Sequence, residues 1–142
     1  FKTIVVTNQS ALHRGLISPD TLDALHAAMT REVRSHGGRI DDIFYCPHTP
    51  QEGCNCRKPA PGMIENARRK HGIDLDRSGM VGVSAKDNAW ARRAGVRYAV
   101  LVKTGDFARA KKELDDINLK PDWVAADLYE AVEWLLERFQ RL

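Results

Sequence analysis

CPHTPQEGCNCRKP, residues 46–59, is the stretch around which the rest of this 142-residue chain is organised. All three cysteines of the protein lie inside it, and with one histidine they form the pattern C-x-H-x5-C-x-C. The four residues are Cys46, His48, Cys54 and Cys56. Three thiolates and one imidazole complete the tetrahedral ligand set of a structural Zn²⁺ and leave no position for water. We therefore predict a structural zinc site in this loop.

The same cysteines allow other interpretations. Three thiols cannot all pair within one chain, and C-x-C neighbours rarely bridge each other, so a disulfide framework is disfavoured. A redox pair or a chance cluster of thiols is the remaining alternative. Zinc-ligating thiols are typical of a reducing compartment, which predicts a cytoplasmic protein.

Two adjacent cations, Arg57 and Lys58, directly follow the last predicted zinc ligand. An arginine offers a planar fork that matches a phosphate group, and a lysine offers a point charge. The alternative is a solvated basic pair without a function. We favour phosphate binding, because a metal clamp beside a plain surface pair would have little purpose.

Composition and charge describe an ordinary globular protein. Hydrophobic residues make up 43% of the chain and charged residues 29%, as in ordinary globular proteins. The length of 142 residues predicts a single domain over residues 1–142. No apolar run approaches the roughly 20 residues of a membrane span. The net charge is +3, and the longest basic run, residues 68–70, reads as a solvated helix face. We expect neither a membrane nor a nucleic acid among the partners.

Short apolar runs alternate with helical patterns along the chain. We expect strands at 3–7, 43–46, 80–83, 98–102 and 123–124, the first of them a buried parallel strand. Helices are expected from Pro19 to the Gly37-Gly38 pair, from Pro61 to Gly72, over 85–94 and 107–116, and after the N-cap Asp127.

Two of these helices carry apolar stripes. The expected inward residues are Leu22, Leu25, Met29 and Val33 in the first helix, and Leu128, Val132, Leu135, Leu136 and Phe139 in the last.

The alternation predicts an α/β domain with a mostly parallel sheet. In such sheets ligands bind at the carboxyl ends of the strands. The segments that fall at this edge are residues 7–10, the metal loop with Lys58, residues 84–87 and residues 103–105.

Several of these motifs resemble the haloacid dehalogenase superfamily. They are VVTNQS (5–10), Arg14-Gly15, CPH (46–48), CNCRKP (54–59), PGM (61–63) and MVG (80–82). Within the superfamily the chain is similar to the zinc-bearing D,D-heptose 1,7-bisphosphate phosphatases and the related histidinol-phosphate phosphatases. Residues 7–10, Arg14-Gly15 and Thr104-Gly105 favour the heptose branch. The resemblance implies a Rossmannoid three-layer α/β sandwich with a zinc-binding loop insertion.

The resemblance also implies hydrolysis of a phosphorylated sugar. One aspartate attacks phosphorus, a second protonates the leaving oxygen, and Mg²⁺ neutralises charge. Thr7 would bond the phosphoryl oxygens, Lys58 would pair with them and with the nucleophile, and Arg57 would hold the distal part of the substrate. The other implied residues are Asn8, Gln9, Ser10 and Arg14 for substrate binding, and Asp87 for the magnesium end of the site.

The chain departs from the family pattern at two points. The family's nucleophile motif, D-x-D-G-T, ends an additional first strand, and these 142 residues do not contain it. The spacing recurs at residues 74–76, but these precede the third expected strand. Val83 stands where the family has a metal-binding acid, and Ser84 where the heptose branch usually carries lysine. We therefore expect an N-terminally incomplete or degenerate member with its first strand missing. It lacks the acids that would hold Mg²⁺ and attack phosphorus, so we expect residual hydrolysis or none.

Three further functions stay open at this point. The chain could be an inactive pseudo-phosphatase that holds a phosphorylated ligand or a protein, a histidinol-phosphate phosphatase, or a zinc-stabilised structural domain. A protein segment that completes the sheet is an expected partner, because unpaired strand edges attract other strands.

Overall fold

The structure, a computed structural model, describes residues 1–142 and divides the chain into two units, Phe1–His71 and Gly72–Leu142. The first unit contains β1 (Ile4–Asn8), α1 (Pro19–Ser35), β2 (Asp42–Cys46), the short 3₁₀ helix η1 (Pro50–Glu52) and α2 (Gly62–His71). The second contains η2 (Leu75–Arg77), β3 (Gly79–Gly82), α3 (Ala85–Ala94), β4 (Tyr98–Val102), α4 (Phe107–Asp116), β5 (Trp123–Ala125) and α5 (Leu128–Gln140).

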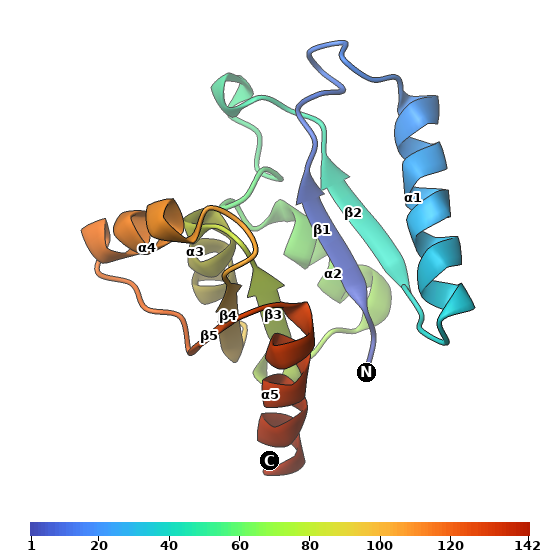
Figure 1. The fold of residues 1–142 in the computed structure, drawn as a ribbon. Helices are drawn as coiled ribbons and strands as arrows, with labels where there is room; N and C mark the ends of the chain where they lie inside the picture. Colours follow the sequence, from blue (N-terminus) through green and yellow to red (C-terminus); the bar gives the residue numbers. More distant parts are fainter. The chain divides into compact units, whose positions relative to one another are not determined.

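In the first unit β1 and β2 form a parallel pair, in register from Ile4 beside Asp42 to Asn8 beside Cys46. The helix α1 runs beside β2 (Figure 1), and the rings of His26 and Tyr45 lie 5.9 Å apart. The helix α2 packs on both strands and buries Met63. Both strands therefore deliver their last residues to the same end of the unit, where the metal loop begins.

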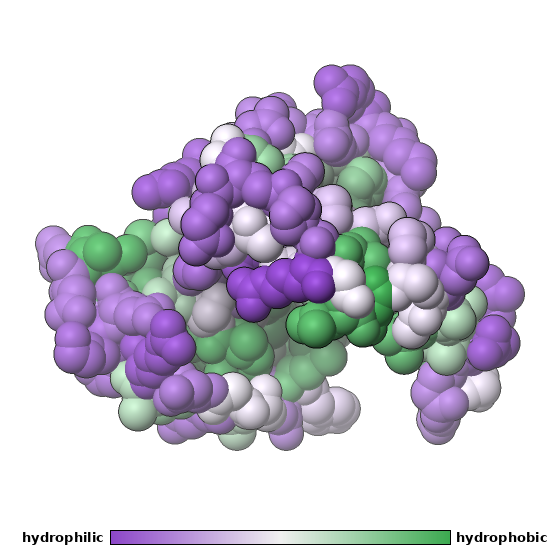
Figure 2. All heavy atoms as spheres, turned by 90° about the horizontal axis from the view of Figure 1, so that it is seen from above, coloured by the Kyte–Doolittle hydropathy of each residue, from purple (hydrophilic) through white to green (hydrophobic).

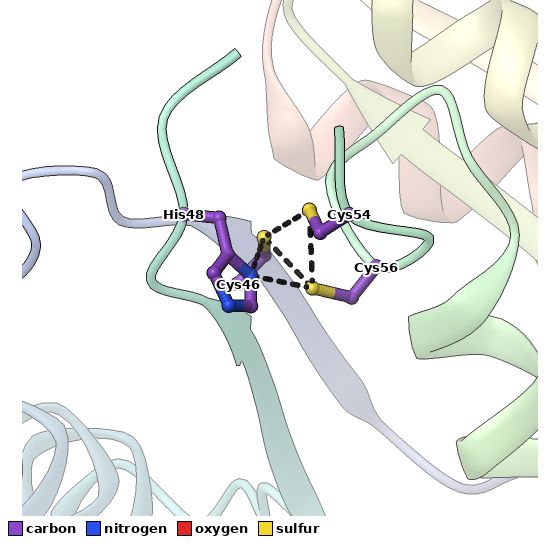
Figure 3. A group of neighbouring side chains, drawn as sticks. All are labelled: Cys46, His48, Cys54 and Cys56. Carbon is purple, nitrogen blue, oxygen red and sulfur yellow. Dashed lines mark hydrogen bonds between the residues drawn. The ribbon is translucent and has the colours of Figure 1, made fainter. Parts of the chain in front are cut away.

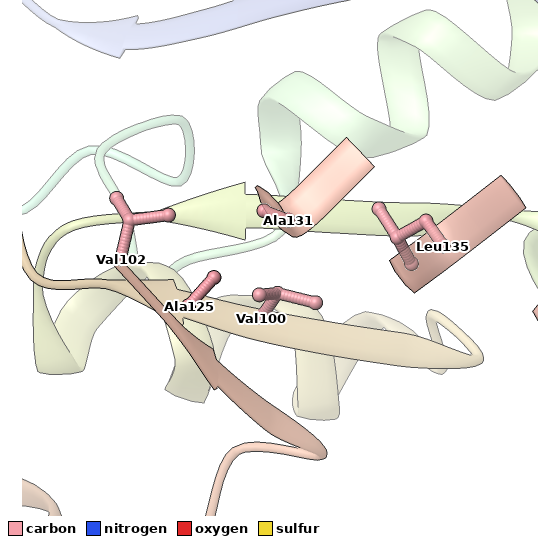
Figure 4. Close-up of a cluster of buried hydrophobic side chains, with 5 residues drawn as sticks. All are labelled: Val100, Val102, Ala125, Ala131 and Leu135. Atoms are coloured by element: carbon pink, nitrogen blue, oxygen red, sulfur yellow. The ribbon is translucent and has the colours of Figure 1, made fainter. Parts of the chain in front are cut away.

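In the second unit β4 lies between β3 and β5, and all pairs are parallel. Successive side chains of a strand point to opposite faces. Val100 and Val102 accordingly join a core cluster with Ala131 and Leu135 of α5 (Figure 4), whereas Leu101 packs with Ala85, Ala110 and Leu114 of α3 and α4. The central strand is thus covered on both faces.

The predicted order of elements is confirmed, and most boundaries agree to within a residue or two. Ser18 caps α1 by accepting a hydrogen bond from the Thr21 N–H at 3.1 Å, with Pro19 in the first turn. The helix at 107–116 is supported by three ion pairs with i,i+4 spacing: Arg109–Glu113, Lys111–Asp115 and Lys112–Asp116. The two short 3₁₀ helices were not predicted.

Three burial predictions are wrong. β1 is half-buried along its length, because β2 is its one ladder neighbour and its other edge carries no ladder. Leu25 of α1 is exposed. The inward face of α5 is set by Ala131 and Leu135, which leaves Leu128, Val132 and Leu136 exposed. A periodic apolar pattern identifies the helix but fits two neighbouring faces, and packing selects one of them.

Apolar residues therefore reach the surface in several places. Figure 2 shows them in green among hydrophilic residues in purple. Val83, expected inside the third strand, lies just after β3 and is 45% exposed.

No helix combines the length and the apolar character that crossing a membrane requires.

Candidate functional site

The predicted metal ligands come together at the end of β2. Cys46 is its last residue and is fully buried, His48 follows two residues later, and Cys54 and Cys56 return after η1. Figure 3 shows the four side chains converging, and their ligand atoms all lie within 4.8 Å of one another. Gly53 makes the return possible, because its φ of 64° is a left-handed conformation that glycine adopts without steric cost.

The cluster has the dimensions of a zinc site. The sulfur atoms of Cys46 and Cys56 are 2.9 Å apart, those of Cys46 and Cys54 3.5 Å, and His48 Nδ1 lies 3.2 Å from the Cys56 sulfur. A zinc–sulfur bond of about 2.3 Å gives a tetrahedron with edges of about 3.8 Å. A shift of a few tenths of an ångström outward would admit the ion, with Nδ1 as the histidine ligand atom.

The thiols of the cluster differ in acidity. Burial raises the pKa of Cys54, but the backbone N–H groups of Arg57 and Cys56 and the neighbouring thiols donate to its sulfur and bring the pKa down to about 6. Burial, followed by the adjacent Cys46 and Cys54 sulfurs, raises the pKa of Cys56 to about 12. The Cys54 thiolate therefore forms readily. A second thiolate beside it would be repelled by the first unless a bound cation compensates the negative charge.

The metal loop is tied directly to Arg57. The guanidinium Nη1 donates a hydrogen bond to the carbonyl oxygen of His48 at 3.2 Å. The loop then closes onto α2 through a 2.8 Å bond from the Gly62 N–H to the carbonyl oxygen of Asn55. A side chain at Gly62 would put its Cβ 2.6 Å from that oxygen, so this position requires glycine.

Lys58 is tied instead to β1. Its backbone N–H donates to Asn8 Oδ1 at 3.0 Å, and Asn8 Nδ2 donates to the Lys58 carbonyl oxygen at 3.4 Å. The ammonium Nζ donates to the carbonyl oxygen of Val6 at 3.3 Å. The two cations of the predicted phosphate site thus have separate supports.

The other candidates of the first unit lie at the end of β1 or just beyond it. Gln9 Nε2 donates to Thr7 Oγ1 at 3.1 Å, and the Gln9 N–H extends the strand pairing to the Cys46 carbonyl oxygen at 2.7 Å. Ser10 and Arg14 sit in the following turn, where the Arg14 N–H bonds the Ser10 carbonyl oxygen at 3.0 Å. Their side chains make no hydrogen bond or ion pair, and Arg14 is exposed.

Sequence reasoning missed a contact between this turn and the metal loop. His13 Nδ1 lies 3.1 Å from Glu52 Oε1 in η1. No motif joins the two residues, and they are far apart in the sequence. The one local signal was the pattern of η1 itself, in which Thr49 and Glu52 form a capping box.

In the second unit, Asp87 occupies the first turn of α3 and is 7% exposed. Its Oδ2 accepts hydrogen bonds from the Val83 N–H, the Ser84 N–H and the Ser84 hydroxyl at 3.1, 3.2 and 2.9 Å. The Cys/His cluster is the one group of three or more histidine, cysteine, aspartate or glutamate side chains placed to share an ion. Valine offers no oxygen to a hard cation, so the side chain at position 83 cannot supply the metal-binding acid that the family resemblance implies there.

Comparisons with known proteins bear on the family. The model of the HAD-hydrolase-like family matches residues 55–131. The D-glycero-beta-D-manno-heptose-1,7-bisphosphate 7-phosphatase of Bordetella bronchiseptica is 45% identical over 135 residues, which cover 94% of this chain and 73% of the relative. The enzyme of that name from Pseudomonas aeruginosa is 43% identical over 105 residues, covering 74% of this chain and 58% of the relative.

A similar solved structure belongs to an enzyme named for the same activity as these relatives. It is the crystal structure of D,D-heptose 1,7-bisphosphate phosphatase from B. bronchiseptica complexed with magnesium and phosphate. Its TM-score is 0.85 at 40% identity, and the match covers 96% of this chain and 75% of that chain. The parallel α/β fold and the sequence identity lead to the same conclusion: the chain belongs to the D-glycero-D-manno-heptose-1,7-bisphosphate 7-phosphatase family of HAD-like hydrolases.

Proposed function

We propose that this chain takes part in the hydrolysis of a phosphate from a heptose bisphosphate, and that its first unit grips the phosphorylated sugar. One observation carries the proposal. Arg57 and Lys58 follow the Cys/His cluster, and Lys58 is held against the end of β1 by Asn8, one residue after Thr7. This places cationic and hydroxyl donors at the carboxyl ends of two parallel strands, where α/β folds bind their ligands.

In this proposal Zn²⁺ occupies Cys46, His48, Cys54 and Cys56, and its role is structural. Four protein ligands saturate the ion, so it fixes the loop instead of activating water. Arg57 donates a 3.2 Å hydrogen bond to the His48 carbonyl oxygen. Because the metal fixes the loop, this bond also fixes the position of the arginine side chain.

The phosphate group is bound by charge and by hydroxyl donors. Lys58 and Thr7 meet the phosphoryl oxygens, and Arg57 holds the distal part of the substrate with its planar fork. Gln9 orients the Thr7 hydroxyl through their 3.1 Å hydrogen bond. Ser10 and Arg14, whose side chains have no partner in the protein, are the remaining candidates for contact with the sugar.

In this proposal Val83 and Asp87 do not form a magnesium site. When magnesium is bound in the family, it neutralises charge on the phosphoryl group. Here position 83 is valine, and three donors already occupy Asp87 Oδ2, so Asp87 serves to close the turn between β3 and α3. This favours a second candidate function, a binding protein for phosphorylated sugars without turnover.

Three further features belong to the proposal. Residues 1–142 form one HAD-like three-layer sandwich domain that works in the cytoplasm, where zinc-ligating thiols stay reduced. β1 and β3 are edge strands of separate sheets, and each unpaired edge could receive a strand from another segment. Histidinol phosphate is the alternative substrate, and the names of the relatives favour the heptose.

The test is calorimetric binding of D-glycero-D-manno-heptose 1,7-bisphosphate and of histidinol phosphate to zinc-loaded protein, with phosphate release followed in parallel. We expect saturable binding of the heptose ligand, at least tenfold weaker in Lys58→Met. Lys2→Met removes the same charge from an exposed position and should bind normally. Binding with turnover identifies a phosphatase, and binding without turnover identifies the binding protein. Preferential binding of histidinol phosphate, or equal binding by Lys58→Met, would refute the proposal.

A further inference from the structure

We propose that Asn8 is a positioning residue that fixes Lys58 for phosphate and acts on the bound phosphate through that lysine. This inference rests on the proposed function, because it concerns the lysine that the function requires. The family resemblance implies Asn8 as a substrate-binding residue, and the inference adds a positioning role.

The geometry is that of a two-point clamp. An asparagine amide presents an acceptor oxygen and a donor NH₂ group side by side, which matches the N–H and C=O groups of a single residue. Asn8 uses both: its Oδ1 accepts from the Lys58 N–H at 3.0 Å and its Nδ2 donates to the Lys58 carbonyl oxygen at 3.4 Å. The amide plane is therefore oriented toward the backbone of Lys58.

The clamp determines where the lysine side chain starts. Asn8 is the last residue of β1, and Lys58 lies 50 residues away in a loop without regular structure. With the backbone held at two points, the remaining freedom of Lys58 is its side-chain rotamers. The ammonium group then rests 3.3 Å from the carbonyl oxygen of Val6, two residues before Asn8 on the same strand.

Asn8 therefore holds the backbone of Lys58 to β1, and the Val6 carbonyl oxygen receives its ammonium group. Arg57 receives its support from the metal loop through the His48 carbonyl oxygen. Alanine at position 8 removes both hydrogen bonds to Lys58, and the flexible stem of the lysine then samples positions away from the phosphate. Aspartate keeps the acceptor for the Lys58 N–H but loses the donor to its carbonyl oxygen.

The first test measures hydrogen exchange at single amides in zinc-loaded protein by NMR. In Asn8→Ala the Lys58 amide should exchange at least tenfold faster, while the Gly62 amide, bonded to Asn55 in the same loop, should keep its rate. Asn8→Asp should restore the protection of the Lys58 amide. Asn66→Ala, the same change on the exposed face of α2, is the matched control and should leave both rates unchanged. An unchanged Lys58 rate in Asn8→Ala would overturn the inference.

The second test is a double-mutant cycle with Lys58→Met, with inorganic phosphate as the probe and the heptose bisphosphate as a second ligand. Asn8→Ala should weaken phosphate binding about tenfold in the wild-type background and should have no further effect beside Lys58→Met. Equal weakening in both backgrounds would show that Asn8 acts on phosphate directly, and no weakening in the wild-type background would also overturn the inference. If the cycle with inorganic phosphate gives the expected result but the chain does not prefer the heptose bisphosphate over histidinol phosphate, the proposed substrate is refuted. The role of Asn8 would still stand.

Discussion

Asp42, the first residue of β2, provides a quantitative test of the first unit. Its Oδ2 lies 2.6 Å from Lys70 Nζ and 2.7 Å from His71 Nε2, both at the end of α2, and its Oδ1 accepts from the Ile43 N–H at 2.8 Å. The Asp42 side chain is 19% exposed. The hydrogen bond from Lys70, followed by that from His71, lowers the pKa of Asp42 from 3.8 to about 2. The contact fastens α2 to the start of the strand that carries Cys46.

This shift in pKa can be converted into stability. Since the pKa of Asp42 is depressed in the folded state, its contribution is complete above the unfolded value of 3.8 and disappears as the pH falls towards 2. The shift corresponds to roughly 2 kcal/mol at neutral pH. Lys70 is 62% exposed, and solvent screening around it reduces this amount. We therefore expect Asp42→Asn to lower the free energy of unfolding of the first unit by about 1–2 kcal/mol at pH 7.

The assay is hydrogen exchange of the amides in the β1–β2 ladder, measured for both proteins between pH 7 and pH 2. The difference between wild type and Asp42→Asn should shrink through the window from 3.8 to 2, and zinc loss at low pH is common to both proteins. Asp23→Asn on the exposed face of α1 is the control and should change nothing. A difference that is absent at pH 7, or that grows as the pH falls, would refute the reasoning.

Three other predictions concern metals and the metal loop. Metal analysis of protein purified without chelator should give about one zinc per chain for the wild type and much less for Cys56→Ser; well-folded wild-type protein without zinc would be incompatible with the site. Gly62→Ala should weaken zinc binding, because its Cβ would lie 2.6 Å from the Asn55 carbonyl oxygen; a chelator titration that gives equal affinity would show that the loop relaxes freely. Millimolar Mg²⁺ should leave the melting temperature unchanged, whereas Asp87→Asn should lower it through the turn between β3 and α3; a magnesium-dependent rise that Asp87→Asn abolishes would instead make Asp87 a metal ligand.

Much of the fold followed from local signals in the sequence. Ser18-Pro19 and Gly72 mark helix ends by their own backbone and capping chemistry, and the metal loop is recognisable by ligand type and spacing. The inward face of α5 was not predictable, because Leu128 and Leu135 are equally apolar and only tertiary packing distinguishes them. The partial exposure of β1 could not be foreseen either, since it depends on which strand lies beside it.

In the candidate site, too, local sequence signals were predictive and long-range contacts were not. Residue types identified the zinc ligands, Arg57 and Lys58, but not how each cation is supported. The side chain of Asn8 reaches across 50 residues to the Lys58 backbone, and His13 contacts Glu52 between two loops. Such long-range polar contacts leave no periodicity or spacing in the sequence. The hydrogen bonds that Asp87 accepts from Val83 and Ser84 were not predicted either, because the sequence shows a carboxylate but not its partners.

The central claim is that a zinc-supported loop presents Arg57 and Lys58 to a phosphorylated sugar. The most direct measurement compares the affinity of the zinc-loaded and the zinc-depleted chain for D-glycero-D-manno-heptose 1,7-bisphosphate by calorimetry. We predict saturable binding to the zinc-loaded chain, at least tenfold weaker after zinc removal and recovered when zinc is added back. Equal affinity in both states, or no binding to the zinc-loaded chain, would contradict the account.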